Sequence, residues 1–282
     1  MSKPTTQSAG SGPANYICAT CGTQFPDSAA PPQECPICED ERQYIGHAGQ
    51  RWTTLAELQR ERTNAFREIE LGLTGIGSEP AFAIGQQAHL IETPNGNVLW
   101  DCISLIDDAT VTEINRRGGL AAIAISHPHF FSSMAEWSAA FANVPIYLHA
   151  DHRPFVVRTD APITYWEGET REIVPGVTAI RCGGHYPGSS VLHWAAGAGG
   201  GSLFTGDTIY VVQDRRWVSF MYSYPNLIPL NAASVNRIVA AVEPFSFDRL
   251  HSSWHGSVVA SDAKNAVARS AARYIAHISP TS

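Results

Sequence analysis

Three histidines and one aspartate have the types and positions of metal ligands. His127 and His129 directly follow the apolar run at 120–125, and His185 and Asp207 each follow a later apolar segment and a glycine. Side chains two residues apart on extended backbone return to the same face, so His127 and His129 can face one ion. Three neutral imidazoles leave a bound cation open to water, whose pKa then falls towards about 7. We therefore expect a metal site suited to hydrolysis.

Four cysteines near the N-terminus form a second candidate site. They stand in two C-x-x-C pairs, Cys18 with Cys21 and Cys35 with Cys38, 13 residues apart. Two such turns complete a tetrahedron of thiolates around one ion, which is zinc or iron; free or disulfide-bonded thiols are the alternative. A module this small cannot bury enough apolar surface to fold without its ion. The two other cysteines, Cys102 and Cys182, are expected to be buried free thiols.

The cysteine segment resembles a known small domain. YICATCG (16–22) and PPQECPIC (31–38) are similar to the rubredoxin-like domain at the end of rubrerythrins. The resemblance implies iron as an occupant, whereas zinc in a zinc-ribbon module would have a structural role.

The remaining chain predicts a layered α/β domain, because short apolar strands alternate with helices. We divide the sequence into a disordered tail (1–15), a rubredoxin-like or zinc-ribbon module (16–50), a linker helix (51–78) and the large domain (79–282). The linker helix is expected from Thr53 to about Leu71, with Thr54 and Glu57 as a capping box and Gly72 as its stop. Further helices are expected at 108–117, 132–142, 232–242 and 261–278.

The charge and hydropathy exclude several partners. A net charge of −7 provides no cationic surface for nucleic acid or an anionic membrane. No apolar run reaches the length of a membrane span, and the first residues lack the apolar core of a secretory signal. We expect a soluble, cytoplasmic protein that acts on a small-molecule substrate; the sequence gives no indication of the oligomeric state.

The order of the motifs resembles the metallo-β-lactamase superfamily over about residues 79–278. The segments SHPHFFS (126–132), GGHYPGS (183–189), LFTGDT (203–208) and SWHG (253–256) follow the order of the superfamily's HxHxDH loop, GH-x-PGS histidine, GD aspartate and final histidine. QAHLIETPNGNVLWD (87–101) is similar to its first hairpin, whose terminal aspartate is here Asp101. The resemblance implies an α/β fold, the αββα sandwich. It also implies that His127, His129 and His185 hold the first metal, Asp207 is the bridging carboxylate and His255 belongs to the second metal.

One departure from the superfamily pattern changes the expected site. Where the superfamily has Asp-His, this chain has Phe131-Ser132, and neither side chain ligates well. We therefore expect one ion, zinc, iron or manganese, held by the three histidines and Asp207. His152 follows the strand expected at 145–150 and is a candidate replacement ligand, with an ordinary loop residue as the alternative.

The resemblance and the imidazole site together favour a hydrolase. It would cleave an ester, thioester or lactone through a metal-bound hydroxide, with Asp207 and His255 as catalytic residues. Two alternatives stay open: an iron-dependent redox protein, and a non-catalytic binding or regulatory protein on a degraded scaffold.

Overall fold

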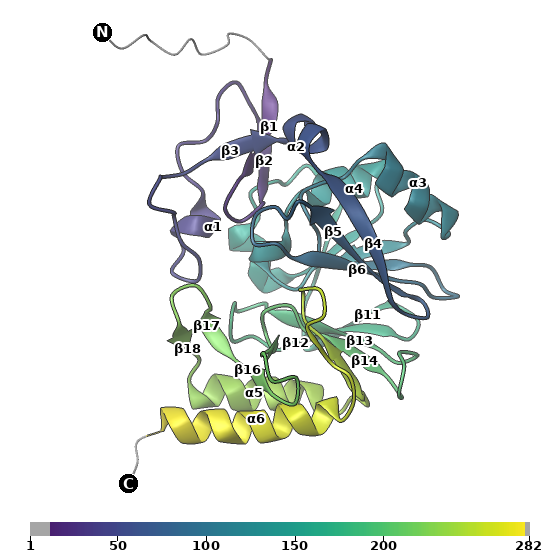
Figure 1. Ribbon diagram of the computed structural model, residues 1–282, viewed down its shortest axis with the longest axis vertical. Coiled ribbons are helices and arrows are strands. Elements are labelled where there is room, and N and C mark those ends of the chain that lie inside the picture. Colours follow the sequence, from purple (N-terminus) through teal and green to yellow (C-terminus); the bar gives the residue numbers. More distant parts are fainter. Residues whose placement is uncertain (1–11, 280–282) are drawn as a thin grey trace.

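Two large sheets stacked face to face form the centre of the molecule. The computed structural model describes residues 12–279 (Figure 1). The first sheet has seven strands in the order β10 (Ile163–Trp166), β9 (Ile146–His149), β8 (Ala122–Ala124), β7 (Val98–Trp100), β6 (Gln87–Ile91), β5 (Leu73–Glu79) and β4 (Thr63–Glu70). The second has six, in the order β11 (Thr170–Val174), β12 (Val177–Arg181), β13 (Ser190–Trp194), β14 (Ser202–Phe204), β19 (Arg249–His251) and β20 (Val258–Val259).

Helices cover the outer face of each sheet. Helices α3 (Asp108–Arg116) and α4 (Met134–Ala140) pack on the seven-stranded sheet, where Trp137 joins the buried cluster of strand residues. Helices α5 (Ala232–Val242) and α6 (Ala263–Ile278) lie against the six-stranded sheet (Figure 1). Trp100 and Phe204, from different sheets, belong to a third cluster between the sheets. The expected αββα sandwich is therefore confirmed.

The N-terminal module is a small sheet with one short helix. Its strands are ordered β2 (Gln24–Ser28), β1 (Ala14–Cys18) and β3 (Trp52–Thr54). Helix α1 (Pro36–Glu39) contains Cys38 and directly follows Cys35. Figure 1 shows the loop after α1 close to the turn that joins β17 (Met221–Ser223) and β18 (Ile228–Pro229). A further hairpin joins β15 (Tyr210–Val211) to β16 (Val218–Ser219). Most of the expected tail lies outside the described residues, but its last two residues belong to β1.

The predicted linker helix is correct only in its first half. The capping box of Thr54 and Glu57 is present, but helix α2 spans only Leu55–Glu61. The residues expected to continue it to Leu71 form strand β4, which pairs with β5 as an antiparallel hairpin in the seven-stranded sheet. Gly72, predicted as a helix stop, lies in the turn of this hairpin with φ of 77°. The seven-stranded sheet thus includes residues from 63 onward, not 79.

The described residues include no helix that is both long and apolar enough to cross a membrane.

Candidate metal centre

A tight turn after β8 presents the first two histidines. His127 precedes the 3₁₀ turn η1 (Pro128–Phe130), which contains His129. Pro128 suits the first position of this turn because its fixed φ is helical and it has no N–H to satisfy. The convergence of the two imidazoles therefore depends on a proline-initiated turn. The expected alternation of extended backbone is not the cause.

Two loops of the other sheet supply the remaining members. His185 lies between β12 and β13, and Asp207 follows β14. Gly206, just before Asp207, has φ of 51°, and a Cβ atom there would lie 2.7 Å from Ser126 Oγ. A larger residue would be strained and would push the two loops apart. The glycine thus lets the aspartate approach the histidine loop.

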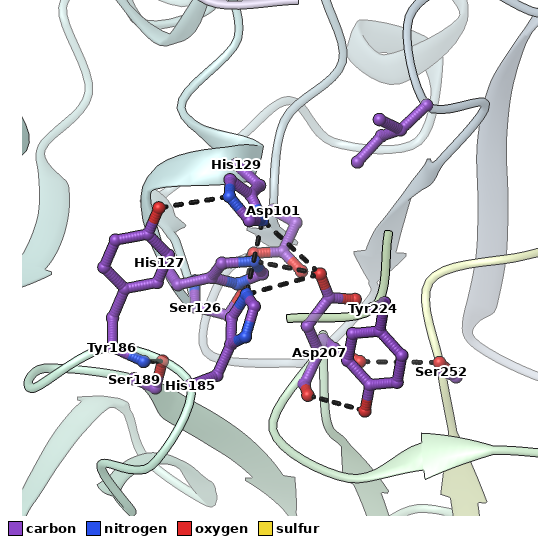
Figure 2. Close-up of polar contacts among 12 residues, drawn as sticks. Asp101, Ser126, His127, His129, His185, Tyr186, Ser189, Asp207, Tyr224 and Ser252 are labelled. Carbon is purple, nitrogen blue, oxygen red and sulfur yellow. Dashed lines mark hydrogen bonds and ion pairs between the residues drawn. The ribbon is translucent and has the colours of Figure 1, made fainter. Parts of the chain in front are cut away.

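The four side chains converge on one point (Figure 2). One donor atom from each of His127, His129, His185 and Asp207 lies within 4.8 Å of all the others, and all four residues are buried. Asp207 Oδ2 is 3.3 Å from His127 Nε2, 3.6 Å from His129 Nδ1 and 3.7 Å from His185 Nε2. Ligands about 2.0–2.1 Å from a tetrahedral zinc ion lie about 3.4 Å apart. The donor set therefore fits one small cation.

The outward-facing nitrogen of each imidazole has a partner. His185 Nδ1 donates to the backbone carbonyl of Tyr222 at 2.8 Å. His127 Nδ1 is 2.8 Å from Ser126 Oγ, and His129 Nε2 is 3.1 Å from the hydroxyl of Tyr186. Such contacts fix the tautomer and ring orientation of a metal ligand and leave the inner nitrogen free. His127 Nε2 is buried and has no hydrogen-bond partner among the described residues, which suits an atom that binds an ion. Asp207 Oδ2 is the carboxylate oxygen that faces the three imidazoles, and Oδ1 is buried and without a partner in the same part of the chain.

The protonation states also suit a cation. Burial lowers the pKa of His127 to about 4, although Asp207 opposes the shift. Burial and the neighbouring imidazoles hold the pKa of His185 well below its usual range. Burial alone would raise the pKa of Asp207, but the close approach of His127 and His129 holds it well below its usual range. At neutral pH these groups are neutral imidazoles and an ionised carboxylate, the forms that ligate.

Asp101 contacts the histidine site through Ser126. Its Oδ1 accepts from the backbone N–H of Ser126 at 2.8 Å and from Ser126 Oγ at 2.7 Å. Burial raises the pKa of Asp101 to about 8, helped by the charge of Asp207 and opposed by the Ser126 bonds. Because Ser126 Oγ donates to Asp101, it accepts from His127 Nδ1.

Two predicted site residues lie outside the group, so these predictions are corrected. His152 is buried, and its Nε2 is 3.1 Å from the backbone carbonyl of Ser126, so it braces the loop. His255 is exposed and lines a separate cavity of about 300 Å³. It lies in a surface turn after His251, beyond the end of β19.

The residues that replace the superfamily's Asp-His pair are used for packing. Phe131 is buried, with its ring 6.1 Å from that of His152. Ser132 has a left-handed φ of 45°, and its hydroxyl donates to the carbonyl of Cys102 at 3.2 Å.

A small apolar cavity of about 140 Å³ reaches the metal-ligand candidates. It meets His129, His185 and Asp207, and its wall includes Trp254, whose Nε1 donates to the carbonyl of Ile84. Tyr224 also lines it and donates from its hydroxyl to the carbonyl of Asp207 at 3.0 Å. The other lining residues are Gln43, Tyr44, Ile84 and Pro225. Two of these come from the segment that follows the second cysteine pair.

The four N-terminal cysteines also converge. Cys18 Sγ is 3.6 Å from Cys38 Sγ, and Cys21 Sγ is 3.7 Å from Cys35 Sγ. Thiolates about 2.3 Å from a tetrahedral ion lie about 3.8 Å apart, whereas a disulfide needs about 2.05 Å. The cluster fits one ion. Cys102 and Cys182 are buried and unpaired, as expected.

Sequence reasoning missed the groups that support the ligands. Ser126 and Tyr186 stand inside the two histidine motifs, but at positions where the motif names no residue type. Tyr222 acts through its backbone carbonyl, which no side-chain pattern reveals. Adjacency to a ligand was the available signal for Ser126 and Tyr186.

Comparisons with known proteins agree with this architecture. No protein-family model matches the chain. The uncharacterized protein YmaE of Bacillus subtilis (strain 168) is 50% identical over 263 residues, which cover 92% of this chain and 95% of YmaE. The solved structure of VMB-1 has a TM-score of 0.57 at 12% identity and covers 77% of this chain and 98% of its own. The metallo-β-lactamase FIM-1 from Pseudomonas aeruginosa, in its mono-zinc form, has a TM-score of 0.55 at 16% identity and covers 77% and 97%.

Proposed function

We propose, from the premise that the chain belongs to the family of YmaE and has the metallo-β-lactamase fold, that it is a metal-dependent hydrolase. Its substrate is an ester, thioester or lactone, and its histidine site holds one ion. The observation that carries the proposal is the convergence of His127, His129, His185 and Asp207 at tetrahedral spacing. Zinc is the favoured ion, with iron and manganese as alternatives.

Each residue of the site has a separate role in the proposed hydrolysis. His127, His129, His185 and Asp207 would hold a divalent cation, which would act as a Lewis acid and lower the pKa of water. Asp207 has one buried oxygen without a partner among the described residues, and its ionised carboxylate can accept a hydrogen bond from the attacking water there and orient it. The hydroxyl of Tyr224 fixes the aspartate's backbone through its bond to the Asp207 carbonyl. The apolar cavity wall keeps bulk water away from these groups.

The apolar side chains around the four ligands favour a site with a single ion. Phe130 lies with its ring 4.5 Å from that of His127, and Trp254 packs 6.4 Å from Phe130. Apolar side chains thus occupy the surroundings where further ligands would be needed. Phe131 and Ser132 are buried, and His255 is at the surface.

The cavity favours an uncharged acyl substrate. No lysine or arginine is among its lining residues in the described part of the chain, so a phosphodiester or a β-lactam carboxylate would lack a counter-ion there. Exposed apolar side chains lie in the chain next to residues that line the cavity. Tyr44 lines the cavity and is followed by Ile45, and Leu227 is two residues after the lining residue Pro225. The volume of about 140 Å³ accommodates a small group, with any longer chain lying along this apolar rim.

Metal analysis and a substrate panel test the proposal. Zinc-loaded full-length protein is assayed on p-nitrophenyl esters, acyl thioesters, γ-lactones, a phosphodiester and a chromogenic β-lactam. We expect turnover of carbonyl esters that His129→Ala abolishes. His255→Ala is the matched control and should keep the activity, because that histidine lies outside the site. Absence of turnover in metal-replete protein would favour a non-catalytic binding protein, and turnover that survives His129→Ala would place the chemistry elsewhere.

A further inference from the structure

The cysteine module inserts one arginine between two tyrosines of the large domain. The guanidinium of Arg42 lies 4.4 Å from the ring centre of Tyr186 and 4.5 Å from that of Tyr222. Asp40 fixes its direction, with Arg42 Nη1 donating to the two carboxylate oxygens at 2.8 and 2.7 Å. The Arg42 side chain is only 13% exposed. A desolvated cation between two aromatic faces is a strong and directional contact.

Each of these tyrosines also holds the outer nitrogen of a metal-ligand candidate. The hydroxyl of Tyr186 contacts His129 Nε2, and the backbone carbonyl of Tyr222 accepts from His185 Nδ1. The position of Arg42 therefore constrains two of the three imidazoles through one intermediate residue each. His127 is held separately, by Ser126.

The module contacts the large domain at two places, one after each cysteine pair. After the first cysteine pair, Gln24 donates its backbone N–H to the carbonyl of Ser132 at 3.0 Å. After the second pair, Asn226 Nδ2 donates to the carbonyls of Glu41 and Gln43, at 2.9 Å each. The segment with Arg42 is thus anchored on one side by the large domain. On its other side lies helix α1, which carries Cys38.

We infer that Arg42 is a positioning residue for the histidine centre, and that through it the cysteine module sets the affinity of that centre for its ion. An ion held by the four cysteines would fix α1, Asp40 at the C-terminal end of α1 pairs with Arg42, and Arg42 stacks on the two tyrosines that contact the imidazoles. Partners of this kind pre-orient ligands, and their loss lowers metal affinity by about 10- to 100-fold. The inference rests on the proposed metal binding of the histidine site but not on hydrolysis.

Zinc affinity of the full-length protein tests the coupling. The histidine site is titrated by competition with a chelator, while element analysis verifies that the cysteine site stays loaded. We expect Arg42→Ala to weaken zinc binding by about 10-fold, and Arg42→Lys, which keeps the charge but not the planar stacking, to recover only part of the loss. Arg216→Ala is the matched control: Arg216 pairs with Asp214 two residues before it, as Arg42 does with Asp40, but is 80% exposed.

Cobalt absorption supplies a second readout, because the ligand-field bands of the histidine site shift when its imidazoles reorient. If Arg42→Ala also releases the cysteine-site ion, Tyr186→Phe tests the same chain of contacts, since it keeps the ring under Arg42 but removes the hydroxyl. An unchanged affinity and cobalt spectrum in Arg42→Ala would overturn the inference, and so would an unchanged Tyr186→Phe where Arg42→Ala loses the cysteine-site ion. A wild-type protein that loads only the cysteine site would instead refute the proposed function.

Discussion

Ser126→Ala removes the support of one imidazole while leaving every proposed ligand in place. Ser126 Oγ bridges His127 Nδ1 at 2.8 Å and Asp101 Oδ1 at 2.7 Å. Without the hydroxyl, the N–H at His127 Nδ1 loses its acceptor. Because His127 is 0% exposed, water does not replace it. The imidazole then loses the contact that keeps its proton on Nδ1 and its lone pair on Nε2.

Two magnitudes follow from this geometry. A buried donor left without its partner costs about 1–3 kcal/mol of folding free energy. The loss of an orienting partner lowers the affinity of a ligand set for its ion by about 10- to 100-fold. We therefore expect Ser126→Ala to lower both the free energy of unfolding and the zinc affinity of the histidine site.

A neighbouring serine separates the two effects. Ser133 is equally buried, and its hydroxyl donates to the carbonyl of Ser104 at 2.8 Å, but it touches no proposed ligand. Urea unfolding should show a similar loss for Ser126→Ala and Ser133→Ala, whereas chelator competition should show weakened zinc binding only for Ser126→Ala. Equal zinc affinities for the two variants would refute the argument that Ser126 orients His127.

Three further predictions concern other parts of the site. Asp207→Asn should weaken zinc binding by more than about 10-fold in chelator competition, because it removes the only negative charge among the four donors; wild-type affinity would contradict its role as a ligand. Phe131→Asp with Ser132→His should bind no second ion by element analysis and should lower the free energy of unfolding by about 4 kcal/mol or more, because a buried aromatic side chain is replaced by a carboxylate. Two ions in the histidine site would contradict it. Burial lowers the pKa of His251 to about 4, so its protonation opposes folding as the pH falls below about 6.5. His251→Phe should therefore reduce the loss of unfolding free energy between pH 8 and pH 5 by about 2 kcal/mol, and equal losses in wild type and variant would contradict it.

Local signals in the sequence were sufficient for most of the fold. Asp107 directly precedes the helix predicted at 108–117, and it accepts from the Thr110 N–H at the start of α3. The apolar run at 120–125 contains β8, which is buried between two parallel neighbours. These elements were predictable because capping and continuous apolarity act over a few residues.

The hairpin of β4 and β5 was missed because its local signals are ambiguous. Leu55, Leu58, Phe66 and Ile69 share a helical spacing, yet only the first two belong to α2. Phe66 instead pairs with Ile76 across the hairpin, and Ile76 is fully buried. The pairing partner lies ten residues along the chain, so a short periodic window does not contain the contact that decides the structure.

The metal-ligand candidates were recognised by motif order, but their supports depend on contacts between distant segments. Arg42 belongs to no motif, and its stacking on Tyr186 joins residues 144 positions apart. His255 was assigned by order alone, and the structure places it in a surface turn. Motif order therefore identifies residues that share an ion more reliably than it identifies those that orient them.

The loss of the Asp-His pair and the presence of the cysteine module concern the same loop. The carbonyl of Ser132, where the superfamily has histidine, accepts the N–H of Gln24 from the module. Gly22 packs beside it with φ of 83°, and a Cβ atom there would lie 2.6 Å from Ser104 Oγ and 3.6 Å from Ser132 Oγ. A histidine at 132 would project from a left-handed backbone into this tight contact. The loop at 131–132 contacts the module in this chain, and we therefore propose that a histidine ligand at 132 would be incompatible with this contact.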